Sequence, residues 1–168
     1  SVIAEEGCLS IPEYAEKVSS GQFSKMLEYL TQLYAYVIVD TAPALTDLTL
    51  ATIEVSDLIV LITTQDIPSI KNSRLFLDLL QSLGVRRERV MFIMNRFDKK
   101  VNITPERVSD NLKQEVALVI PADEPTAVKA VNRGVPFVLD NKSQPVARGV
   151  QALADAISAR FPQGGITL

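Results

Sequence analysis

The chain has 168 residues, a net charge of −3 and 47% hydrophobic residues, a composition in the range of ordinary globular proteins. It contains no histidine and one cysteine, Cys8, so histidine-ligated zinc sites, Ser-His-Asp or Cys-His catalysis and an internal disulfide are excluded. No apolar run approaches the roughly 18 residues of a membrane span, and the acidic balance gives no strong nucleic-acid signal. We expect one cytoplasmic domain over residues 1–168.

The first part of the chain is organised around an apolar run at residues 36–40. Residues 1–4 predict a short strand, and residues 23–34 carry apolar side chains at helical spacing. The run at 36–40 then ends in Asp40, and its β-branched and aromatic residues suit a strand buried on both faces of a parallel sheet. Ligands of such sheets bind beyond the carboxyl ends of the strands, so Asp40 could hold Mg²⁺ through water. The alternative is that Asp40 caps a turn after a core strand.

The rest of the chain alternates apolar runs with amphipathic patterns. Apolar strands alternating with helices predict right-handed βαβ units, hence an α/β fold with a mostly parallel sheet of about five strands and helices on both faces. Gly84 and Gly134 occupy positions typical of left-handed helix caps. The further predicted strands are 58–63, 90–94 and 116–120, and the further predicted helices are 47–53, 68–83, one that begins at Pro105, 124–132 and 145–161.

Four of the five predicted strands end in polar residues. Because the carboxyl ends of parallel strands meet at one edge of a sheet, these residues predict a ligand site at that edge. For Asn95-Arg96 taken alone, an ordinary turn at the end of a strand is the alternative. The four polar ends are Asp40-Thr41, Thr63 to Asp66, Asn95-Arg96 and Pro121 to Asp123.

The order and spacing of these segments resemble the MinD/ParA group of deviant P-loop ATPases over nearly the whole chain. Within that group the sequence is most similar to the CpaE/TadZ-type proteins that position pilus-assembly machinery at the cell pole. The segments that carry the resemblance are Val37-Ile38-Val39-Asp40-Thr41-Ala42-Pro43, Asp57 before an apolar strand, Ile93-Met94-Asn95-Arg96, Val119-Ile120-Pro121-Ala122-Asp123 and Asn132-Arg133-Gly134-Val135-Pro136.

The resemblance implies ATP and magnesium as cofactors. It makes Asp40 the Walker B acid that contacts the magnesium shell, with Thr41 and Pro43 in the opening of the switch II loop. Asn95 corresponds to the family asparagine beside the adenine, and an amide offers a purine both donors and an acceptor. Arg96 follows it in the candidate set, with a surface or interface position as the alternative. Pro121 and Asp123 correspond to the loop that closes over the base.

The sequence departs from this family at the phosphate-binding loop. None of the seven glycines is followed by the required lysine and hydroxyl residue, so the chain is similar to the C-terminal portion of such an ATPase. We therefore expect this chain alone to be inactive as an ATPase.

For the intact protein, we expect a homodimeric, nucleotide-dependent localisation switch in pilus assembly or secretion. The alternatives are a non-catalytic scaffold of the same fold and a DNA-partitioning ATPase. Arg86, Arg87 and Arg89 could serve DNA, although a solvated loop explains this cluster better because Glu88 lies within it.

Overall fold

The computed structural model describes residues 19–41 and 44–162. The predicted strand at 1–4, Cys8 and the candidate residue Pro43 lie outside the described residues. The chain divides into two compact units, residues 1–57 and residues 58–168, and each is described here by itself. One continuous domain over 1–168 stays a prediction.

The described part of the first unit contains two helices in contact with each other, α2 (Ser20–Leu33) and α3 (Asp47–Val55). Ser19 forms a capping box at the start of α2: its hydroxyl accepts the Gln22 N–H, and the Gln22 side chain accepts the Ser19 N–H at 3.1 Å. Thr46 caps α3 by accepting the Thr49 N–H. Both predicted helices are therefore confirmed, and α2 begins three residues before the apolar pattern that predicted it.

The prediction of a strand at residues 36–40 is wrong for the described residues. This segment is extended, but it is not one of the strands of the described sheet, and the Ile38 side chain is 86% exposed. An apolar, β-branched run supplies strand propensity, whereas a strand also needs a neighbouring strand for its backbone hydrogen bonds. The sequence pattern shows the strand propensity of residues 36–40 but does not show whether a neighbouring strand is available.

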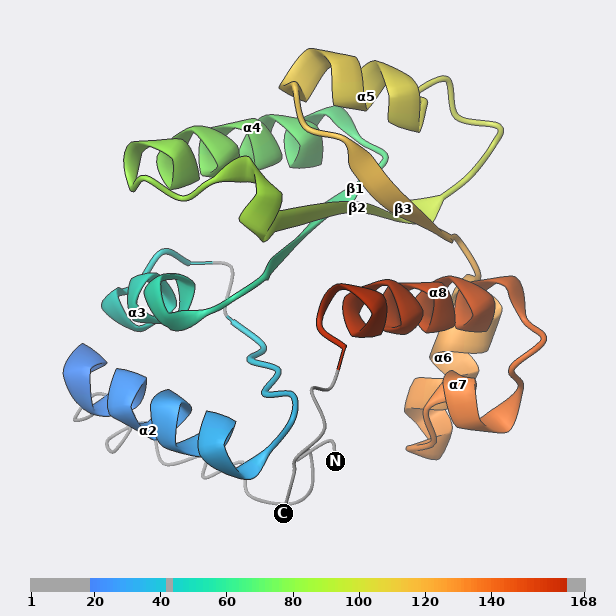
Figure 1. Ribbon diagram of the computed structural model, residues 1–168. Coiled ribbons are helices and arrows are strands. Elements are labelled where there is room, and N and C mark those ends of the chain that lie inside the picture. The colour runs from blue at the N-terminus through green and yellow to red at the C-terminus, as the bar shows by residue number, and fades with distance from the viewer. Residues whose placement is uncertain (1–18, 42–43, 163–168) are drawn as a thin grey trace. The chain divides into compact units, whose positions relative to one another are not determined.

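The second unit is built on a parallel sheet of three described strands in the order β1-β2-β3, not the five predicted. These strands confirm three of the predicted apolar runs, and β2 is central, with a parallel neighbour on each side. Figure 1 shows helices on both sides of this sheet. The strands are β1 (Ile59–Thr64), β2 (Val90–Phe97) and β3 (Val116–Pro121).

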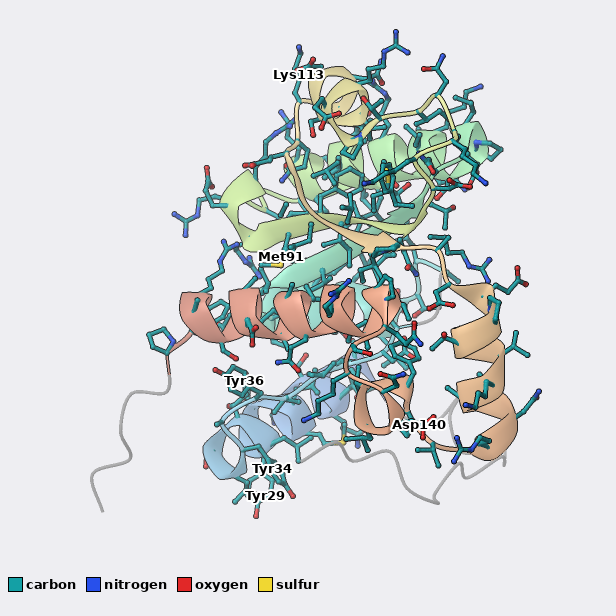
Figure 2. The ribbon with its side chains drawn as sticks, turned by 90° about the vertical axis from the view of Figure 1, so that its right-hand side faces the viewer. Tyr29, Tyr34, Tyr36, Met91, Lys113 and Asp140 are labelled. Carbon is teal, nitrogen blue, oxygen red and sulfur yellow. The ribbon has the colours of Figure 1, made fainter. Side chains whose placement is uncertain are left out.

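Alternate residues of β2 enter two separate cores. On one face Met91 and Ile93 pack with Ile120 of β3 against α8 (Pro145–Arg160), and Figure 2 shows Met91 between the sheet and this helix. On the other face lie α4 (Ile67–Ser82) and α5 (Pro105–Leu112), and β2 contributes Phe92 and Met94, both 0% exposed. The sequence prediction of strands buried on both faces is thus confirmed for β2.

Short elements complete this unit. The 3₁₀ turn η1 (Arg87–Arg89) precedes β2, and α6 (Glu124–Arg133) and the short α7 (Phe137–Asp140), which was not predicted, lie between β3 and α8. Gly134 ends α6 in the left-handed conformation (φ 61°), as expected for a glycine cap. None of the helices in the described ranges is long and apolar enough to cross a membrane.

Candidate functional site

At the end of β1, side-chain hydroxyls and one carboxylate hold the start of α4. The Thr64 N–H donates to Ser69 Oγ (3.0 Å), and the Ser69 N–H donates to Asp66 Oδ1 (2.8 Å). The Thr64 hydroxyl donates to the other oxygen of the same carboxylate. The hydrogen bond from the Thr64 hydroxyl, followed by that from the Ser69 N–H, lowers the pKa of Asp66 below its usual value. Asp66 is therefore an anionic N-cap of α4 rather than a free ligand group.

At the end of β2, the candidate residues Asn95 and Arg96 occupy a break in the sheet. Regular pairing with β3 stops after Met94 and resumes at Phe97, which pairs with Pro121. Arg96 adopts a left-handed backbone conformation (φ 54°), uncommon for a residue with a side chain, and its N–H donates to Asn95 Oδ1 (2.9 Å). The Asn95 amide oxygen is thus already engaged by the backbone, while its nitrogen carries the two N–H donors.

The end of β3 places the remaining candidates of this unit beside those of β2. The Ala122 N–H donates to the Phe97 carbonyl oxygen at 3.0 Å, which ties the residue after Pro121 to the end of β2. Asp123 Oδ1 accepts the Thr126 N–H at 3.2 Å and caps α6. The structure therefore gathers Asn95, Arg96 and Pro121 at neighbouring strand ends and gives Asp123 a capping role that the sequence analysis did not assign to its side chain.

Asp40 and Thr41 belong to the first unit, so the structure does not join them to the ends of β2 and β3. Both are exposed at the end of the extended segment 36–40. An exposed carboxylate suits a water-mediated contact with Mg²⁺ that is also held by phosphate oxygens. Across 19–41 and 44–162, no group of three or more His, Cys, Asp and Glu residues could hold a metal ion without such help. Asp40 therefore stays a candidate for a magnesium contact.

Gln65 has a position that sequence reasoning did not recognise. Its amide nitrogen donates to the Ile103 carbonyl oxygen at 2.6 Å, and its amide oxygen accepts the Asp98 N–H at 2.9 Å. The sequence analysis noted the polar run 63–66 but assigned Gln65 no role. The signal was a glutamine directly after an apolar strand, and its partners, 33 and 38 residues away, could not be identified from local patterns.

A hollow of about 280 Å³ between α6 and α7 contains none of the predicted site residues. Lys129 and Arg133 line or flank it, and both pair with the Asp140 carboxylate, at 3.8 and 2.9 Å. Figure 2 labels Asp140 in this part of the molecule. Two cations thus share one carboxylate at this hollow, and because none of the predicted residues lines it, the strand ends remain the candidate site. The residues that line it are Thr126, Lys129, Ala130, Phe137, Asp140, Asn141 and Gln144.

No family model matches the sequence. The septum site-determining protein MinD of Thermotoga maritima is 24% identical over 147 residues, which cover 84% of this chain and 54% of that protein. The chain thus spans about half the length of this curated relative.

Solved structures share the fold. A ParA family ATPase of Chlorobium tepidum superposes with a TM-score of 0.80 at 19% identity. The match covers 86% of this chain and 60% of the ParA chain. MinD of Pyrococcus horikoshii, solved with Mg-ADP, gives a TM-score of 0.76 at 19% identity, with 92% and 63% covered. The MinC:MinD complex of Aquifex aeolicus gives a TM-score of 0.76 at 23% identity, with 90% and 62% covered.

The fold is that of the MinD and ParA nucleotide-binding ATPases. The sequence match to MinD supports homology with this group, as the motif resemblance predicted.

Proposed function

We propose that this chain is part of a MinD/ParA-like ATPase that binds an adenine nucleotide with magnesium. The supporting observation is the placement of Asn95 and Pro121 at neighbouring strand ends, within a fold shared with a MinD protein solved with Mg-ADP. Open α/β sheets bind ligands beyond the carboxyl ends of their strands, which is where these two residues lie.

In this proposal the chain supplies the base side of the nucleotide site. An N–H of Asn95 donates to N1 of the adenine, an acceptor that guanine replaces with an N–H, because the Asn95 amide oxygen already accepts the Arg96 N–H. The backbone from Pro121 to Asp123, tied to β2 through Ala122, forms the wall that closes over the base. In this arrangement other residues bind the phosphates.

Asp40 supplies the metal side by accepting hydrogen bonds from water in the magnesium shell. When bound, magnesium neutralises phosphate charge and orients the phosphate oxygens. Thr41 follows Asp40 directly and Pro43 comes two residues later, so a change at the phosphates would reach the switch II loop through them. That arrangement suits a switch in which the bound nucleotide controls partner contacts.

For the biological role we propose a homodimeric localisation switch that acts at the cell pole in the cytoplasm, in pilus assembly or secretion. Support comes from the similarity of the motif series to CpaE/TadZ-type proteins. A non-catalytic scaffold is the second candidate, because the 168 residues contain no glycine-lysine phosphate loop. A DNA-partitioning role has less support, because Arg87 donates to the carbonyl oxygen of Lys113 at the end of α5 rather than standing free for phosphate.

Calorimetric titration of the complete protein with ATP and magnesium tests the proposal. We expect measurable binding by the complete protein and, for the 168-residue chain alone, a dissociation constant weaker than about 1 μM, equivalent to about −8 kcal/mol. Asn95→Ala should weaken binding by about tenfold, and Asn72→Ala, at an exposed asparagine of α4, should leave it unchanged. Absence of nucleotide binding by the complete protein would favour the scaffold, and equal effects of both variants would reject Asn95 as the base contact.

A further inference from the structure

The amide side chain of Gln65 forms hydrogen bonds with both ends of the loop that joins β2 to α5. The loop runs from Asp98 to Ile103, and Gln65 accepts the N–H of its first residue and donates to the carbonyl oxygen of its last. A glutamine amide carries the same donor and acceptor as a peptide group, so Gln65 bonds this backbone as a neighbouring strand would. An ionised carboxylate could not replace it, because it has no donor.

The backbone that presents Gln65 is itself held on both sides. The Thr64 N–H and the Asp66 carboxylate both bond Ser69 in the first turn of α4. Thr63, one residue further back, is 1% exposed, and its hydroxyl lies 3.1 Å from Ser69 Oγ. The glutamine therefore projects from an anchored strand end, which makes it a fixed point for the loop.

The loop also has internal bonds at its start. Asp98 Oδ1 accepts the Lys100 N–H at 2.9 Å, and the Asp98 carbonyl accepts the Val101 N–H at 3.1 Å. These bonds form a turn around Asp98, so fixing the Asp98 N–H with Gln65 fixes the turn as a unit.

The clamp adjoins the candidate base contact. Asp98 directly follows Phe97, whose carbonyl accepts the Ala122 N–H, so the backbone after Asn95-Arg96 is held from two sides, by β3 at Phe97 and by Gln65 at Asp98. The left-handed conformation of Arg96 lies in this short interval, between the regular pairing that ends at Met94 and these two bonds. An unfavourable backbone conformation persists where its surroundings determine it.

We propose that Gln65 is a positioning residue for base recognition: its amide clamps the 98–103 loop and thereby sets the direction in which Asn95 presents its N–H donors. This inference rests on the proposed function, because the base that Asn95 reads is the adenine of that site. Gln65 touches neither nucleotide nor metal in this role.

The first test measures the clamp without any nucleotide. Gln65→Met removes donor and acceptor at similar length, and Gln65→Glu keeps only an acceptor. Hydrogen exchange at the Asp98 and Arg96 amides should become about tenfold faster in Gln65→Met and rise less in Gln65→Glu. Gln81→Met, at an exposed glutamine on α4, is the matched control and should leave both amides unchanged. Unchanged exchange in Gln65→Met overturns the proposal whatever the protein binds.

The second test uses the complete protein and compares ADP with GDP. A residue that only stabilises the fold would weaken both nucleotides equally, whereas a residue that positions the base contact changes their ratio. We expect Gln65→Met to lower the preference for ADP over GDP by about fivefold, with Gln81→Met at the wild-type ratio. An unchanged ratio together with faster exchange overturns the positioning role. Failure of the wild-type protein to bind either nucleotide overturns both the proposed function and the positioning role of Gln65. The wild-type titration alone reveals this outcome, before any variant is made.

Discussion

Residues 36–40 and β1 (Ile59–Thr64) have similar sequences and different structures. Each is an unbroken apolar run that follows a helix and ends in a hydroxyl or carboxylate residue. β1 pairs with β2 along its whole length, from Ile59 with Val90 to Thr64 with Asn95, whereas residues 36–40 are extended outside the described sheet. Asp40 and Asp66 are both exposed, and the polar end of β1 leads into Asp66, which caps α4.

This difference shows what an apolar run does and does not specify. Strand propensity and hydrophobicity are properties of the run itself, but pairing depends on a second segment distant in sequence. For β1 the partner, β2, is described and lies 31 residues along by register. Residues 36–40 and β1 should therefore differ in solution in their burial, their tendency to associate and the roles of their polar ends.

The largest expected effect comes from truncating the same residue type in the two environments. Ile93→Ala in β2, at a side chain that is 0% exposed, should lower the free energy of unfolding by about 2–5 kcal/mol. Ile38→Ala, at 86% exposure, should change it by less than about 0.5 kcal/mol. Urea denaturation followed by circular dichroism gives both values. A large cost for Ile38→Ala would mean that residues 36–40 are buried in solution.

The second prediction concerns the edge of β1. Among the described strands β1 pairs with β2 alone, it carries no charge or proline, and its Ile62 side chain is 55% exposed. Such edges favour association, and a net charge of −3 opposes it little, so we expect the 168-residue chain to self-associate. Ile62→Lys should weaken association by about tenfold, and Val131→Lys, on an exposed position of α6, should have little effect. Sedimentation across a concentration series measures this, and a wild-type chain that stays monomeric throughout contradicts it.

The third prediction compares the two polar ends. Asp66→Ala removes the acceptor for the Ser69 N–H at the start of α4 and should cost about 1 kcal/mol of unfolding free energy. Asp40→Asn should leave the free energy of unfolding within about 0.5 kcal/mol of wild type while weakening magnesium-dependent nucleotide binding of the complete protein. An unfolded Asp40→Asn variant would show that Asp40 is a structural cap and would reject its assignment to magnesium.

The smallest expected effect is the pH dependence of the Asp66 cap. Because hydrogen bonds lower the pKa of folded Asp66 below its unfolded value, its contribution to stability is fully present above the unfolded pKa. It is lost as the pH falls through the lower, folded pKa. The stability difference between wild type and Asp66→Asn should be constant from pH 7 to about pH 5 and should shrink below about pH 4. A difference that grows on acidification contradicts this assignment.

Sequence patterns predicted much of the second unit and part of the candidate site. The three described strands, the helices around them and the left-handed glycine caps follow from periodicity and capping residues, which act within a few positions along the chain. Asn95 and Pro121 were predicted at strand ends, and the structure places them on neighbouring strands. Asp123-Glu124-Pro125 predicted the start of α6, and the structure adds that the Asp123 side chain is its cap.

By itself the sequence determined most of the strands and helices of the second unit, α7 excepted, and which polar residues follow each strand, because these properties depend on near neighbours. Only the tertiary structure decided which apolar runs are paired, how the register of β2 breaks at Asn95-Arg96 and which backbone groups Gln65 binds. The physical reason is that strand pairing and side-chain bonds to a distant loop form between segments that no local pattern connects. These contacts exist only once the chain has closed the separations between partners, which run from 24 to 38 residues.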